Sequence, residues 1–144
     1  RFEDYVLEFE QEGTAGYHSY DLNRMEFNMN SYTPILDHAA VIPLTHELFA
    51  NDAIFFTDLR SKKVTLKNPA TGYGVEVSYP DFATVAFWTA AATKAPFLCV
   101  EPWNGSAIRS DEDDNFLNRH FLQKLEGEAS KEYRIEIKKI SQQL

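Results

Sequence analysis

The chain has 144 residues, of which 44% are hydrophobic and 25% charged, and this balance is typical of a folded globular domain and excludes a disordered or collagen-like chain. Its 14 Lys and Arg against 22 Asp and Glu give a net charge of -8, and because the basic residues are scattered we expect no binding to nucleic acid or anionic membrane. No apolar run approaches the roughly 20 residues that cross a bilayer, so we expect no membrane partner.

Cysteine, histidine and carboxylate spacing give little support to a metal site or a disulfide. Cys99 is the only cysteine, so no internal disulfide can form, which favours a cytoplasmic location, and its apolar surroundings predict a buried small residue. The acidic run 111–114 lacks the alternating ligands and central glycine of an EF-hand loop and is expected to be a solvated loop. We therefore expect neither metal nor cofactor.

Short runs with period-two alternation predict β-strands along most of the chain. The expected strands cover residues 5–10, 25–29, 53–56, 64–67, 74–78, 84–89, 96–101 and 131–139. Residues 68–72 (Asn-Pro-Ala-Thr-Gly) are turn formers and predict a hairpin between two of these strands. Only 44–49 and 115–122 are expected to form short helical turns. The pattern predicts an all-β protein, an antiparallel β-sandwich.

The segment most typical of a site is 95–105, Ala-Pro-Phe-Leu-Cys-Val-Glu-Pro-Trp-Asn-Gly. Pro102 has no N–H, so we expect it to end the strand and to leave Glu101 at the rim of the sheet. Partial burial beside Trp103 would suit Glu101 as a general base. The alternative is a surface glutamate at a strand end.

Here the residues resemble a known family. Residues 97–105 resemble the C-terminal signature of the aldose 1-epimerase (galactose mutarotase-like) family, and residues 48–56 resemble its segment that brings an aspartate to the sugar. Further likenesses follow in the family's order at 61–66, 81–82, 87–88, 125–128 and 133–137. The resemblance therefore covers nearly the whole chain.

The resemblance implies a galactose mutarotase-like supersandwich roughly twice as long as this chain. Residues 1–144 would then be the C-terminal part of one sandwich domain, with its N-terminal part absent from this chain. Family members interconvert the α and β anomers of free aldoses without a cofactor. The resemblance makes Glu101 the base, Asp52 a ligand of sugar hydroxyls and Trp103 part of the aromatic wall. Without it, Asp52 is typical of a turn residue that caps a strand.

Trp88 is a further candidate for the aromatic wall, although core packing is the more ordinary interpretation. Arg109 would face the site and select a charged substituent, or it would pair with the acidic loop. Residues 118–121 depart from the family's pattern after the base, which leaves the contribution of this loop to the site open.

The family's proton donor is a histidine in a Gly-His-Pro motif followed by an aromatic residue, and this motif is absent from the sequence. The four histidines, His18, His38, His46 and His120, match neither this motif nor a zinc-type grouping, and we expect structural or surface roles for them. The acid would come from the N-terminal half of the same protein.

The hypothesis is an aldose 1-epimerase-like isomerase of cytoplasmic carbohydrate metabolism that acts on a monosaccharide and is completed by its N-terminal half. One alternative is a non-catalytic carbohydrate-binding protein of the same fold. Another is a structural piece of a cleaved or separately described protein whose other part completes the site.

Overall fold

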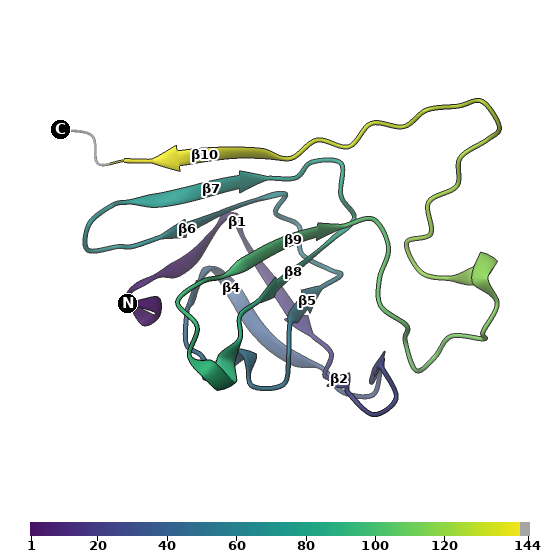
Figure 1. Cartoon of the computed structure of the whole chain (residues 1–144), viewed down its shortest axis with the longest axis horizontal. Helices are drawn as coiled ribbons and strands as arrows, with labels where there is room; N and C mark the ends of the chain where they lie inside the picture. Colours follow the sequence, from purple (N-terminus) through teal and green to yellow (C-terminus); the bar gives the residue numbers. More distant parts are fainter. Residues whose placement is uncertain (142–144) are drawn as a thin grey trace.

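The computed structural model describes residues 1–141, which form two antiparallel sheets and a small hairpin (Figure 1). The larger sheet has the strand order β10-β7-β6-β1-β4 and the smaller has the order β5-β8-β9. Among the described residues, the helical segments are four short 3-10 turns, and none of them is long and apolar enough to span a membrane. The expected all-β, antiparallel architecture is confirmed.

Each sheet takes its strands from separate parts of the chain. The larger sheet contains β1 (Val6–Tyr17), β4 (Thr33–Pro43), β6 (Lys63–Lys67), β7 (Gly74–Ser78) and β10 (Glu136–Ile140). The smaller sheet contains β5 (Ile54–Phe56), β8 (Thr84–Trp88) and β9 (Cys99–Trp103), and the hairpin contains β2 (Tyr20–Asp21) and β3 (Glu26–Phe27). The 3-10 turns are η1 (Phe2–Asp4), η2 (Glu47–Phe49), η3 (Ala91–Thr93) and η4 (Phe116–Asn118).

The inner faces of the two sheets enclose the main core. Three rings at its centre, Phe9 of β1, Phe56 of β5 and Phe87 of β8, meet edge to face with centroids 6.0–6.2 Å apart. Each is at most 4% exposed. Such pairs add about 0.5–1.5 kcal/mol each beyond the burial of their area. The aromatic-rich strands therefore build the predicted sandwich.

The turn between β6 and β7 confirms the predicted hairpin. The Asn68 side-chain oxygen accepts hydrogen bonds from the Ala70 and Thr71 N–H groups at 3.0 and 3.2 Å, and Gly72 has φ +72°. An Asx turn followed by a left-handed residue is the geometry that asparagine and glycine favour.

Three sequence expectations about the strands were wrong. The longest strand that is missing from the expected set is β4, which contains Pro34 and Pro43. It lies at the edge of the larger sheet, where proline is tolerated. Residues 25–29 do not form one strand, because only Glu26–Phe27 pair and Met25 has φ +57°.

The third error concerns Pro102, which does not end its strand. It lies inside β9, opposite Val85 of β8, and Trp103 continues the pairing opposite Thr84. Since β9 is an edge strand, the missing N–H disrupts no second ladder. Glu101 therefore lies in the middle of the edge strand β9 and not at the end of a strand.

The other expected elements shift by a few residues. The last strand begins at Glu136 and not at 131, and the helical turns expected at 44–49 and 115–122 contract to η2 and η4.

The inner face of β10 extends beyond the smaller sheet and is uncovered. Ile137 pairs with Val77 and so points to the same side of the sheet, yet Ile137 is 73% exposed while Val77 is 9% exposed.

We expect the 144-residue chain expressed alone to be oligomeric or insoluble, because open apolar faces and edges promote association. Size-exclusion chromatography with light scattering measures this. Ile137→Lys should raise the monomeric fraction, and a monodisperse wild-type monomer that unfolds cooperatively would contradict the expectation.

Candidate functional site

The two faces of the smaller sheet have different surroundings. Val85 and Phe87 of β8 point into the sandwich core, whereas Ala86 points to the outer face. Across that outer face, Phe55 of β5 lies opposite Ala86, and Ala86 lies opposite Glu101 of β9. Period-two alternation therefore places the carboxylate of Glu101 on the side away from the core.

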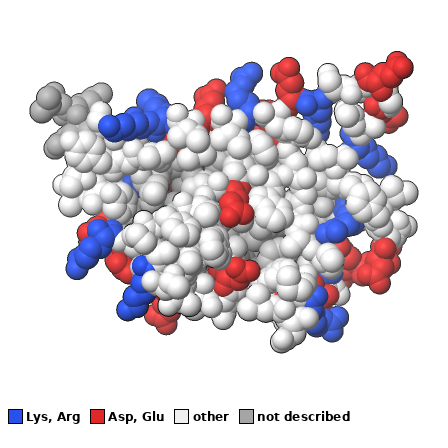
Figure 2. Space-filling model, viewed as in Figure 1, with Lys and Arg blue, Asp and Glu red and all other residues white. Residues whose placement is uncertain are grey.

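A cavity of about 340 Å³ lies over this outer face, and it brings together all three residues predicted for the site. Its lining comprises Tyr20, Leu22, Met25, Phe27, Asp52, Ala53, Phe55, Ala86, Trp88, Glu101, Trp103 and Ala107. Figure 2 shows acidic side chains in the middle of a mostly uncharged face, with both basic and acidic side chains around its margin. The cavity is at the small end of the range for ligand pockets and combines aromatic rings with two carboxylates.

Glu101 and Trp103 touch each other directly. The Trp103 indole Nε1–H donates to Glu101 Oε2 at 3.4 Å. The two residues are separated by one position in an extended strand, so both side chains leave the same face of the sheet. Trp103 is 39% exposed, and one edge of its indole is covered by Phe55, whose ring is 5.3 Å away at 89°.

Asp52 enters the cavity from the segment between η2 and β5. It is half-buried, and its backbone N–H donates to the Phe49 carbonyl at 3.2 Å. Its φ of +88° is in the left-handed region, which is unfavourable for residues with a Cβ. Aspartate enters this region more readily than most residues, and Met25 also lines the cavity with a positive φ, so the functional interpretation of Asp52 rests on its place in the cavity.

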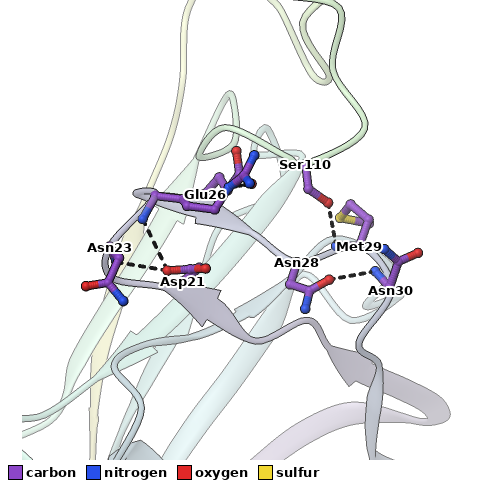
Figure 3. A network of polar contacts seen from close by, with 8 residues as sticks. Asp21, Asn23, Glu26, Asn28, Met29, Asn30 and Ser110 are labelled. Atoms are coloured by element: carbon purple, nitrogen blue, oxygen red, sulfur yellow. Dashed lines mark hydrogen bonds and ion pairs between the residues drawn. The ribbon is translucent and has the colours of Figure 1, made fainter.

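The β2–β3 hairpin forms one wall of the cavity, and a polar network holds its shape (Figure 3). The Asp21 carboxylate accepts from the N–H of Asn23 at 2.9 Å and of Arg24 at 3.1 Å, and Arg24 Nε donates to Glu26 at 2.6 Å. The backbone of the turn is closed by the Met25 N–H, which donates to the Asp21 carbonyl at 2.7 Å.

The segment after β9 anchors this hairpin to the sheet. Phe27 N–H donates to the Ile108 carbonyl at 2.8 Å, and Ser110 N–H donates to the Phe27 carbonyl at 2.9 Å, forming an isolated parallel bridge. The Ser110 hydroxyl also accepts from Met29 N–H at 3.0 Å (Figure 3). As a result, Phe27 is 7% exposed and packs against Phe55 and Ala86.

Sequence reasoning missed the hairpin residues Tyr20 and Phe27 and the floor residues Phe55 and Ala86. The alternation in residues 53–56 could have placed Phe55 on the face opposite to Ile54 and Phe56. No local signal marks Tyr20, because only the tertiary bridge to 108–110 brings the hairpin over the sheet.

Trp88 lines the cavity and is half-buried, so it belongs to the wall and not to the main core. Its ring lies 5.8 Å from that of Phe97. Cys99, opposite Trp88, is half-buried, and burial raises the pKa of its thiol, with the nearby Glu101 charge acting in the same direction.

None of the four histidines lines this cavity within the described part of the chain. His46 has a structural environment: its ring is stacked on Phe2 at 4.4 Å, and its nitrogens contact Glu3 Oε1 at 2.7 Å and the Ala95 carbonyl at 3.0 Å. His18 lies in a neighbouring small cavity and contacts the Ser31 carbonyl. His38 and His120 are exposed.

Arg109 pairs with the acidic loop, as the second of its two interpretations expected. Its Nε and Nη2 donate to the two carboxylate oxygens of Asp111 at 2.9 and 2.7 Å. This hydrogen bonding lowers the pKa of Asp111. Across residues 1–141 no three His, Cys, Asp or Glu side chains are grouped as metal ligands would be.

The positive φ of Asp52 predicts an unusual order of stability at this position. Asp52→Ala and Asp52→Gly both remove the carboxylate, but only alanine keeps a Cβ in the left-handed region. The Ala variant should therefore be less stable than the Gly variant by about 1 kcal/mol. Urea denaturation of both variants in parallel measures the difference, and an Ala variant as stable as the Gly variant would refute the strain.

Comparisons with known proteins agree with the resemblance. No family model matches the chain. It is 30% identical over 112 residues, or 78% of its length, to the chromosomal and the plasmid forms of protein LacX from Lactococcus lactis subsp. lactis. The chain spans 37% of the length of these curated relatives.

Two solved structures share its fold. A galactose mutarotase related enzyme from Lactobacillus acidophilus matches 97% of this chain with a TM-score of 0.75 and 22% identity, and a galactose mutarotase-like protein from Lactobacillus casei matches 96% with a TM-score of 0.67 and 18% identity. The chain covers 44% and 46% of those two chains. The resemblance found in the sequence is confirmed at the level of the fold: the chain is similar to the LacX proteins over 112 residues and has the galactose mutarotase-like fold.

Proposed function

We propose that this chain carries the base and part of the sugar pocket of an aldose 1-epimerase-like enzyme that interconverts the α and β anomers of a free aldose. The observation that carries the proposal is the single cavity shared by Glu101, Asp52 and Trp103. Its aromatic rings can pack against the C–H surface of a sugar ring, and its carboxylates can accept hydrogen bonds from the sugar hydroxyls.

In the proposed reaction, Glu101 takes the proton of the anomeric hydroxyl. The electrons of that O–H bond form the C1 carbonyl as the bond from C1 to the ring oxygen breaks, and the ring oxygen receives a proton from an acid. Rotation about C1–C2 and reclosure in the reverse sense give the other anomer. No cofactor takes part in this scheme. Each positioned proton-transfer group contributes about 10²–10⁴-fold to such a rate.

The acid and the remaining wall of the pocket are assigned to the N-terminal part of the same protein. Two observations support this assignment: the chain covers less than half of its structural relatives, and the four histidines lie outside the cavity. The resemblance further favours a cytoplasmic protein of carbohydrate metabolism.

The alternative is a carbohydrate-binding protein of the same fold without turnover. The observation that favours it is the lack of a candidate acid in the described lining, where the only carboxylates are Asp52 and Glu101. A binding protein needs the aromatic wall and Asp52 but not a base and an acid.

Glu101→Gln separates the two functions. It keeps the shape and hydrogen-bonding capacity of the side chain but cannot accept the proton, so the rate of mutarotation should fall by about 10²–10⁴-fold. Polarimetry or NMR of freshly dissolved α-glucose and α-galactose, with an intact protein that contains this chain, measures the rate. If wild type and Glu101→Gln equilibrate the anomers equally slowly, the enzyme is excluded and the binding protein remains.

Asp52→Asn tests the sugar contact on its own. Asparagine tolerates a positive φ and retains the shape, whereas the charged acceptor is lost. Because hydrogen bonds to charged groups are worth about 1.5–3 kcal/mol, sugar affinity should fall by about tenfold or more. Isothermal titration with the inactive Glu101→Gln protein as background isolates binding from turnover, and unchanged affinity would remove Asp52 from the site.

A further inference from the structure

The two carboxylate oxygens of Glu101, the proposed base, differ in their hydrogen bonding. Trp103 Nε1–H donates to Glu101 Oε2, while no side chain among residues 1–141 is hydrogen-bonded to Glu101 Oε1. Resting on the proposed function, we propose that Trp103 is a positioning residue for Glu101 as well as part of the aromatic wall. Its indole N–H holds Oε2 so that Oε1 is presented to the anomeric hydroxyl, and Phe55 holds the indole.

The backbone at Trp103 is fixed from the side of β8. Thr84, which is 2% exposed, lies opposite Trp103, and its hydroxyl contacts the Trp103 carbonyl at 3.3 Å and the Gly105 carbonyl at 3.0 Å. These contacts fix the backbone from which the indole extends, so the Trp103 side chain can move only by rotation about χ1 and χ2.

A row of rings limits that rotation. The edge-to-face contact of Phe55 with Trp103 is followed by Phe27 at 5.2 Å from Phe55 and by Tyr20 at 5.3 Å from Phe27. Phe55 is 5% exposed and cannot turn away, because Phe27 and Ala86 pack against it. The β2–β3 hairpin thus supports the base through three rings, without touching it.

A donor held against one carboxylate oxygen fixes the orientation of the group, and proton transfer is sensitive to that orientation. Trp103 therefore affects the chemical step more than the binding step. Trp103→Phe removes the N–H but keeps an aromatic face for the sugar. We expect kcat to fall about tenfold with KM within about twofold.

Phe55→Leu should produce the same changes more weakly, since it keeps the N–H but releases the indole. Phe56→Leu is its matched control: the same ring is lost from the neighbouring residue, which faces the sandwich core and not the cavity. It should lower stability while leaving kcat unchanged.

NMR tests the contact between Trp103 and Glu101 without any turnover. The chain has two tryptophans, and the indole N–H resonance that Trp103→Phe deletes identifies Trp103 in NMR spectra of the tryptophan-labelled intact protein. The chemical shift of that resonance should change in Glu101→Gln, which replaces the charged acceptor by a neutral amide, and should stay in place in Trp88→Phe.

The outcomes separate this proposal from the proposed function. An indole resonance unchanged by Glu101→Gln, or a Trp103→Phe variant that raises KM with an unchanged kcat, would overturn the positioning role. Inactivity of the wild type on all aldoses would instead overturn the proposed function, while the indole resonance would still report whether Trp103 contacts Glu101.

Discussion

The alternation of side chains across the three-stranded sheet β5-β8-β9 is the constraint on which both the fold and the candidate site depend. Phe56 and Phe87 on one face complete the core with Phe9, while Phe55, Ala86 and Glu101 on the other face line the cavity. A shift of β9 by one residue would place Glu101 in the core and Val100 in the cavity. Burial of the inner face therefore fixes the carboxylate on the outer face, at a position that the core does not need.

Such a sheet can carry a site only if its outer face is partly covered. The β2–β3 hairpin supplies this cover, and it is too short to be stable by itself, since its two strands pair over two residues each. Its stability comes from the Asp21 turn and from the bridge of Phe27 to residues 108–110. The segment that follows the proposed base is thus also the segment that secures the opposite wall, which couples the two sides of the cavity through the backbone.

The sequence predicted those features that depend on local pattern. Period-two alternation identified most of the strands, the residues at 68–72 identified the β6–β7 turn, and the resemblance brought Asp52, Glu101 and Trp103 to attention, which the structure then places in one cavity. It failed where the position in a sheet decides. Prolines at 34, 43 and 102 argue against strands only when the ladder continues on both sides, and edge position is a tertiary property. Tyr20 and Phe27 were missed for a similar reason, because a contact some 80 residues away in sequence creates their place at the site.

Edge position also explains why proline is suited to the residue between Glu101 and Trp103. Proline in place of another residue removes a donor from an edge strand and limits its φ, so it discourages pairing with further chains and restricts the backbone between the carboxylate and the indole. Both neighbours of Pro102 must leave the outer face at defined angles for the 3.4 Å contact to form. Pro102 itself lies opposite Val85 and is half-buried. The residue that sequence reasoning took as the end of the strand is therefore better understood as the part of β9 that sets the geometry between the proposed base and the side chain that holds it.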